Sequence, residues 1–244
     1  MSALRSLVFN MFMFVFTSLY ILFFLCPLLL FPRAYMTWAV KAWAIILFGV
    51  LKRVVGLDYR ITGEENILTG PVIYSSKHQS AWDTAVFLIL LDKPAYIVKE
   101  ELTKLPFYGP VAQRAGAISV NRDLGATALK KLVRVARNAL DDENKIIIFP
   151  EGTRTTPGEK SAYLPGVTAL YRFSDAPVVP VALNSGLFWS RRSFIKKPGV
   201  ITIEFLEPIE PGLDNKKFME KMENAIETAT ERLIAEAKEE YPHL

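Results

Sequence analysis

The sequence is poor in the residues that most often carry covalent or metal chemistry. Its 244 residues include one cysteine, Cys26, and two histidines, His78 and His243. A single cysteine cannot form an internal disulfide, which is typical of a protein in a reducing compartment. One usable histidine without paired cysteines does not make a ligand set for zinc or a similar metal. We therefore expect no metal centre.

Charge is also absent from a long segment near the beginning of the chain. No charged residue occurs between Ser6 and Pro32, and most positions there are large and apolar. About 20 apolar residues suffice to cross a bilayer, whereas a secretory signal has a shorter apolar region and then a small-residue cleavage site. Pro27 is expected to bend or end the helix because proline removes a backbone donor. The alternative is a helix buried in a large core.

The next segment, from Ala34 to Leu57, mixes apolar residues with tryptophans and cations: Trp38, Lys41, Trp43, Lys52 and Arg53. Such residues favour the headgroup level of a membrane. One crossing, two crossings and a hairpin within one leaflet all fit. We predict membrane-binding helices over residues 1–57 and a second domain over 58–244. Because positive residues prefer the cytoplasmic side, we expect that domain at the cytoplasmic face of the cell membrane.

The overall charge is mildly basic. Lys and Arg total 29 against 25 acidic residues, giving +4. This excess favours anionic lipid or phosphate as partners and does not demand nucleic acid. Basic residues gather at two places, each of which could hold the domain on an anionic surface or form an ordinary solvated face: Lys130, Arg134 and Arg137; and Arg191, Arg192, Lys196 and Lys197.

After Gly56 short apolar runs alternate with amphipathic segments. The predicted strands cover 71–76, 95–98, 117–120, 145–149, 178–183 and 200–205. The predicted helices cover 84–91, 126–140 and 215–240. The run Lys145–Phe149 has no polar alternation, as expected for a strand covered on both faces. Strands alternating with helices predict an α/β fold with a mostly parallel sheet flanked by helices, preceded by the N-terminal membrane-embedded segment.

His78 directly follows the first of these strands, and Asp83 lies five residues later. In a continuous helix these residues would lie about 140° apart and could not touch. If Ser80 caps the following helix, Ser80-x-x-Asp83 forms a capping box and Asp83 can reach back to His78. Asp83 would then orient His78 as a general base. Alternatively, Asp83 only caps the helix.

No strong internal nucleophile accompanies this pair. Serines 75, 76 and 80 are near, but the sequence has no G-x-S-x-G elbow. The simplest mechanism therefore has His78 activate a hydroxyl group of a substrate.

Further polar residues follow other predicted strands. The segment Phe149–Arg154 places Glu151, Gly152 and Arg154 in a tight turn, and a guanidinium suits phosphate. Lys99 and Arg122 also stand at strand ends. Active sites of such folds lie in loops after the carboxyl ends of strands, so these cations could form one anion site. A surface turn with a Glu–Arg ion pair and solvated cations is the alternative.

These segments together resemble the glycerolipid acyltransferase family, specifically bacterial 1-acyl-sn-glycerol-3-phosphate acyltransferases. The resemblance runs from about Gly63 to Leu183. Four family blocks match in order: His78–Asp83 (H-x4-D), Gly116–Arg122, Phe149–Arg154 (F-P-E-G-T-R) and Val179–Ala182. One block alone is a weak signal, and four in order are a strong one.

The resemblance implies a role for each matching residue. His78 would deprotonate the free hydroxyl of lysophosphatidic acid, which attacks an acyl thioester, and Asp83 would hold His78. The phosphate would be bound by three cations: Lys99, Arg122 and Arg154. The acceptor site would be completed by Glu151, Gly152 and Thr153. The product would be phosphatidic acid, the donor acyl-coenzyme A or acyl carrier protein, and no cofactor would be needed.

Two departures from the family pattern bear on the substrate. Lys77 stands where many members have Asn, and the stretch Tyr163–Gly166 lacks a Lys-Gly pair. Acylation of another lysolipid is therefore an alternative. A catalytically silent membrane-binding relative and a hydrolase that uses water are further alternatives.

Overall fold

The structure, a computed structural model, describes residues 2–121 and 125–244. The described strands are β1 (Leu57–Thr62), β2 (Val72–Ser76), β3 (Pro94–Lys99), β4 (Ile118–Val120), β5 (Lys145–Ile148), β6 (Val178–Leu183) and β7 (Gly199–Phe205). The α-helices are α1 (Ser2–Tyr20), α2 (Arg33–Val50), α3 (Asp83–Leu90), α4 (Glu100–Thr103), α5 (Tyr108–Ala115), α6 (Gly125–Asp141), α7 (Pro165–Ser174), α8 (Ser185–Phe188) and α9 (Asn215–Glu240). Shorter helical turns are η1 (Ile21–Leu25), η2 (Pro27–Leu30), η3 (Leu51–Val55) and η4 (Glu64–Asn66).

The strands form one seven-stranded sheet in the order β1-β7-β6-β2-β5-β3-β4. Every neighbouring pair is parallel except β6 and β7, which are antiparallel. Strands β2, β3, β4, β5 and β6 therefore end at the same edge. The predicted mostly parallel sheet is confirmed, and this common edge is where active sites of such sheets lie.

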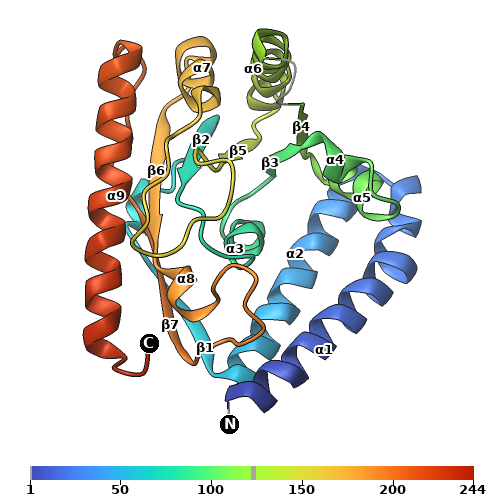
Figure 1. Cartoon of the computed structure of the whole chain (residues 1–244). Helices are drawn as coiled ribbons and strands as arrows, with labels where there is room; N and C mark the ends of the chain where they lie inside the picture. Colours follow the sequence, from blue (N-terminus) through green and yellow to red (C-terminus); the bar gives the residue numbers. More distant parts are fainter. Residues whose placement is uncertain (1, 122–124) are drawn as a thin grey trace.

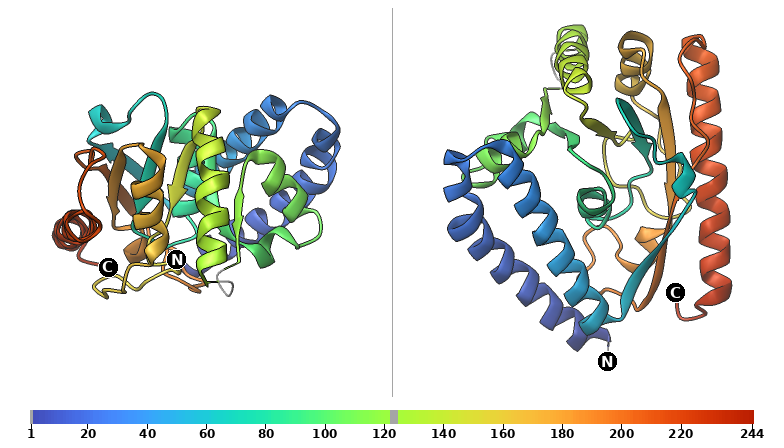
Figure 2. Two further views of the ribbon diagram at one scale, coloured as in Figure 1. Left: turned by 90° about the horizontal axis from the view of Figure 1, so that it is seen from above. Right: turned by 180° about the vertical axis from the view of Figure 1, so that it is seen from behind.

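Helices cover both faces of the sheet, as Figures 1 and 2 show. Alternate residues of a strand point to opposite faces. In β5, Ile147 packs into the cluster that contains side chains of α2 and α3, while Ile146 and Ile148 pack with α6, α7 and α9. Both faces are buried, so these central strands are apolar without alternation.

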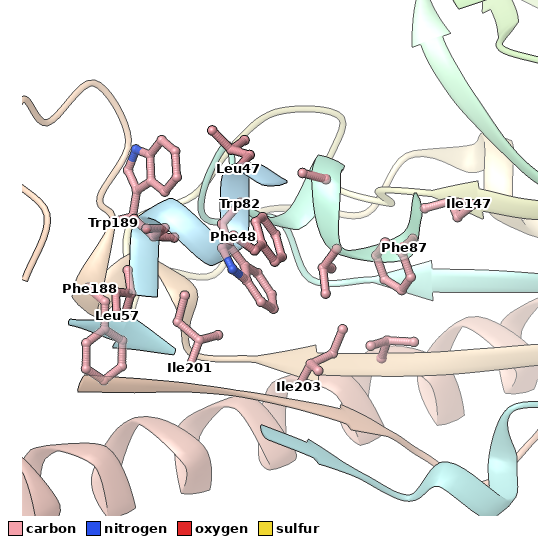
Figure 3. Close-up of a cluster of buried hydrophobic side chains, with 14 of the residues drawn as sticks. Leu47, Phe48, Leu57, Trp82, Phe87, Ile147, Phe188, Trp189, Ile201 and Ile203 are labelled. Carbon is pink, nitrogen blue, oxygen red and sulfur yellow. The ribbon is translucent and has the colours of Figure 1, made fainter. Parts of the chain in front are cut away.

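The N-terminal helices share the hydrophobic core of the sheet. Phe48 of α2 stacks on Trp82, with ring centroids 5.4 Å apart and planes 9° from parallel. Figure 3 shows this pair with Leu47, Phe87 and Ile203 in one cluster. Trp82 immediately precedes α3, so α2 supports the segment that carries His78 and Asp83.

Helices α1 and α2 form a hairpin that is joined to the rest of the protein at both ends. Near the start of α1, the Asn10 side chain donates to the carbonyl of Phe194 at 2.9 Å. At the other end, Arg33 donates to Asn144 at 2.7 Å, and Arg114 donates to the Phe31 carbonyl. Ser2–Leu30 and Arg33–Val55 are each long and apolar enough to cross a membrane by length and composition. The two apolar helices thus indicate membrane association.

Most predicted elements match the structure within two residues. The strand 178–183 and the helix 215–240 have the observed bounds of β6 and α9. The regular helix of the first segment ends at Tyr20, before Pro27, as predicted for a residue that lacks a backbone donor. β1 and four helices, α4, α5, α7 and α8, were not predicted. β1 is a sheet edge paired only with β7, and its residues alternate between apolar and polar.

Candidate active site

Three neighbouring strands bring the polar residues of the site together. β2 lies between β5 and β6 in the sheet, and the three run in parallel. His78 follows the end of β2, Glu151 follows β5, and Ser185 follows β6. Because parallel strands end on the same side, these three residues lie at one edge of the sheet. Glu151 is more than 70 residues from His78 along the chain, and Ser185 is more than 100.

His78 and Asp83 are in contact. The Nδ1 atom of His78 lies 3.1 Å from Oδ2 of Asp83, whose side chain is fully buried. The same oxygen accepts from the backbone N–H groups of Gln79 at 2.7 Å and Ser80 at 2.8 Å. The other oxygen accepts from the hydroxyl of Ser185 at 2.6 Å. Four donors thus fix one carboxylate in the orientation that faces the imidazole.

The predicted capping box forms only in part, whereas the predicted His–Asp contact is present. Asp83 accepts from the Ser80 N–H, while the Ser80 hydroxyl accepts from the Trp82 N–H at 3.1 Å. The Ser80 hydroxyl thus bonds the N–H of Trp82 and not that of Asp83, and α3 begins at Asp83 with Trp82 at its N-cap and, among the described residues, no side-chain cap bond. The loop before the helix turns back, which lets residues five apart meet although a continuous helix would separate them.

The backbone and ring of His78 are also fixed. Its N–H donates to Glu151 at 2.9 Å, and its carbonyl accepts from the Thr155 N–H at 2.8 Å. The imidazole stacks on Phe149, with ring centroids 4.0 Å apart. Among described residues the imidazole hydrogen-bonds only to Asp83, through Nδ1. Nε2 is therefore the ring nitrogen available to a substrate.

A buried ion network lies behind His78. The Lys77 ammonium contacts Glu151 at 2.6 Å and Glu227 of α9 at 2.7 Å. The Tyr163 hydroxyl donates to the same Glu227 oxygen at 2.8 Å. Both sequence departures from the family pattern, Lys77 and the stretch that begins at Tyr163, thus meet at Glu227.

Burial and the charges of this network shift the pKa values of Glu151 and Tyr163. Burial raises the pKa of the Glu151 carboxyl above its usual value, although the ion pair with Lys77 acts in the opposite direction. Burial and the neighbouring Glu227 carboxylate raise the pKa of the Tyr163 hydroxyl. Tyr163 therefore stays protonated and serves as a donor. Removing one ion from a buried group of this kind leaves an uncompensated charge.

His78 opens onto a cavity of about 1040 Å³. One part of the wall is basic and adjoins the turn after β5. The rest is largely apolar and comes from η1, α2, α5 and α6, with side chains such as Ile21, Trp43, Val111 and Leu129. A cavity that joins a base, cations and a long apolar wall suits a molecule with a polar head and an apolar tail.

The structure places the residues predicted from sequence as follows. His78, Asp83 and Glu151 are linked by the hydrogen bonds described above. The cavity with His78 is also lined by Lys99, Gly152, Thr153 and Arg154. Gly152 has φ of +68°, a left-handed conformation that glycine adopts readily, and this permits the tight turn after Glu151. Arg122 lies outside the described residues.

Sequence reasoning missed Ser185 and Glu227. Ser185 stands two residues after the predicted strand 178–183, so the strand-end rule that selected His78 could have found it. Glu227 lies in the middle of a predicted amphipathic helix. Nothing in the local sequence distinguishes it from the exposed glutamates of that helix.

Comparison with known proteins agrees with this geometry. The model of the acyltransferase family matches residues 58–184. A 1-acyl-sn-glycerol-3-phosphate acyltransferase of Pseudomonas aeruginosa is 33% identical over 181 residues, which cover 74% of this chain and 70% of that protein. The chain belongs to the acyltransferase family.

Two further proteins are similar to this acyltransferase at lower sequence identity. The 1-acyl-sn-glycerol-3-phosphate acyltransferase of Saccharomyces cerevisiae is 28% identical over 168 residues, and the match spans 55% of that protein's length. The crystal structure of the 1-acyl-sn-glycerophosphate acyltransferase PlsC from Thermotoga maritima superposes with a TM-score of 0.76 at 22% identity and covers 98% of each chain. The acyltransferase therefore has the same fold over its whole length, including the N-terminal helices.

Proposed function

We propose that this acyltransferase transfers an acyl chain from a thioester to the free hydroxyl of 1-acyl-sn-glycerol 3-phosphate and forms phosphatidic acid for phospholipid synthesis. The observation that carries the proposal is His78, which is oriented by Asp83 and opens onto a cavity with a basic and an apolar wall. The names of the relatives from Pseudomonas aeruginosa and yeast support the same acceptor.

The proposed reaction follows from the two ring nitrogens of His78. Nε2 takes the proton of the acceptor hydroxyl as that oxygen attacks the thioester carbonyl. Asp83 stabilises the resulting imidazolium through Nδ1. When the tetrahedral intermediate collapses, the carbon–sulfur bond breaks, and the thiolate leaves with the proton from Nε2. One ester replaces one thioester, and His78 returns to its initial state.

We assign the basic and the apolar wall of the cavity to different parts of the substrate. We assign the acceptor phosphate to Lys99 and Arg154, which line the cavity together with His78, and to Arg122, which stands in the matching position of the second family block. The apolar wall would receive acyl chains. At about 1040 Å³ the cavity stands at the upper limit of ordinary small-molecule pockets, which leaves room for a lipid tail.

The hairpin of α1 and α2 supports a location of this site at the membrane. Because both its ends are bonded to the α/β part of the chain, it cannot cross a bilayer while that part stays outside. We therefore propose that the hairpin lies in one leaflet. Lys52 and Arg53 at the end of the hairpin favour the cytoplasmic face of the cell membrane.

Purified protein in detergent tests the proposal. The protein is supplied with an acyl thioester, either acyl-coenzyme A or acyl carrier protein. Each donor is assayed with and without lysophosphatidic acid. Thiol release that requires the acceptor, together with phosphatidic acid formation, is the expected result. Equal thiol release without acceptor would identify a hydrolase. Acylation only of a different lysophospholipid would overturn the assigned acceptor.

A further inference from the structure

Two polar residues of the largely apolar helix α1, Ser6 and Asn10, bind one loop. This segment, residues 190–198 between α8 and β7, is called the 190–198 loop below. The Ser6 hydroxyl accepts from the Lys196 N–H at 2.9 Å, and Asn10 donates to the Phe194 carbonyl at 2.9 Å. The buried Lys196 ammonium returns a bond to Asn10. The loop is therefore fixed to α1 along more than one helical turn.

The tip of the loop exposes two large apolar side chains. Phe194 is 52% exposed and Ile195 is 43% exposed. They adjoin the exposed face of α1, because Asn10 stands three residues after Leu7 and four before Phe14, which are both exposed. The apolar surface of α1 thus continues onto the loop.

Cations surround this apolar tip. The sequence from Ser185 to Ile203 has four basic residues and no Asp or Glu. Within residues 2–121 and 125–244, none of Arg191, Arg192 and Lys197 forms an ion pair with a carboxylate. Exposed apolar side chains flanked along the chain by cations that pair with no described carboxylate are complementary to the headgroup region of an anionic leaflet.

We propose that the 190–198 loop is a membrane contact in its own right. Phe194 and Ile195 enter the boundary between headgroups and acyl chains, while Arg192 and Lys197 bind anionic headgroups. Arg191 and Arg192 also line the cavity onto which His78 opens. The loop therefore sets the depth at which the cavity meets the leaflet. This inference concerns membrane geometry and does not depend on the acceptor proposed above.

A fluorescent probe at the loop tip tests the contact. Cys26 is the only cysteine, so Cys26→Ser permits single labelling at Ile195→Cys with an environment-sensitive dye. The matched control is Phe173→Cys on α7, since Phe173 is 50% exposed and α7 lies far from the start of α1 (Figure 1). In nanodiscs that contain phosphatidylglycerol, we expect blue-shifted emission and quenching by shallow nitroxide lipids at position 195 only. Equal, unquenched emission at both positions would overturn the proposal.

The charge requirement has its own test in the same labelled protein. The double variant Arg192→Gln/Lys197→Gln should reduce quenching at position 195 severalfold, as should nanodiscs of phosphatidylcholine alone. The control Lys221→Gln/Lys238→Gln removes two exposed cations of α9 and should leave the quenching unchanged. Equal quenching in all cases would contradict the anionic leaflet as the partner. The readout is independent of catalysis, so failure here and failure of the proposed function can be distinguished.

Discussion

Lys77 connects Glu151, in the turn after β5, with the C-terminal helix α9. It is 1% exposed and lies between Glu151 and Glu227, two carboxylates that are themselves buried. Glu151 in turn accepts from the backbone N–H of His78. An asparagine side chain, which many family members have at this position, is shorter and could not extend as far as this ammonium. The lysine at position 77 therefore requires the acidic partner on α9.

Replacement of this lysine should therefore be costly. Lys77→Met leaves two buried carboxylates without their cation, and we expect the free energy of unfolding to fall by about 3–5 kcal/mol. Glu227→Gln in the same chain should recover part of the loss, with a coupling energy on the order of 1 kcal/mol or more. Chemical denaturation of the two single variants and the double variant measures this coupling.

The control for this cycle is another lysine that contacts α9. Lys160 pairs with Glu231 at 2.9 Å, but both side chains are largely exposed, so Lys160→Met should have little effect. If the effects of Lys77→Met and Glu227→Gln simply add, the buried network does not act as a unit.

At this scale the sequence predicts local contacts better than distant ones. The His78–Asp83 contact spans five residues and follows from the capping pattern at Ser80. The Ser185–Asp83 bond spans 102 residues, and the Lys77–Glu227 bond spans 150. Such pairs depend on strand order and helix packing, which one sequence does not specify.

At the scale of elements, the loops after the strands hold the polar residues of the site, and helices form much of the cavity wall. β2, β5 and β6 were predicted from short, mostly apolar runs, as central strands covered on both faces have. α5 was not predicted, although it lines the cavity with Val111, Ala112 and Ala115. Its eight residues include Gly109 and Pro110, which weaken a helical pattern when the sequence is considered alone.

A substitution in α5 should change the acyl chain that fits. Ala112→Leu adds three carbons to the apolar wall and should lower kcat/KM for a long-chain thioester relative to a short-chain one by about tenfold. Competition between palmitoyl and lauroyl donors measures this ratio. Ala235→Leu, the same change on the exposed side of α9, should leave the ratio as it is. An unchanged ratio in Ala112→Leu would remove this wall from the acyl site.

At the scale of the whole molecule, the N-terminal apolar helices and the α/β part of the chain share one core. Phe9, Phe48 and Leu51 pack in the same cluster as Trp82 and Phe87. The sequence indicates apolar helices before an α/β domain, and the structure shows that α2 also supports the segment that carries the base. Hydropathy alone could not show this, because a membrane face and a core face have the same apolar composition.

In the proposed reaction His78, held by Asp83, activates the acceptor hydroxyl. The most direct test is the rate of acceptor-dependent thiol release by His78→Ala, with His243→Ala as the control. His243 is exposed near the end of the chain, so its loss should leave the rate unchanged. Loss of a general base predicts a fall in kcat of about 100- to 10,000-fold in a folded protein. A His78→Ala variant with full acceptor-dependent activity would contradict the account.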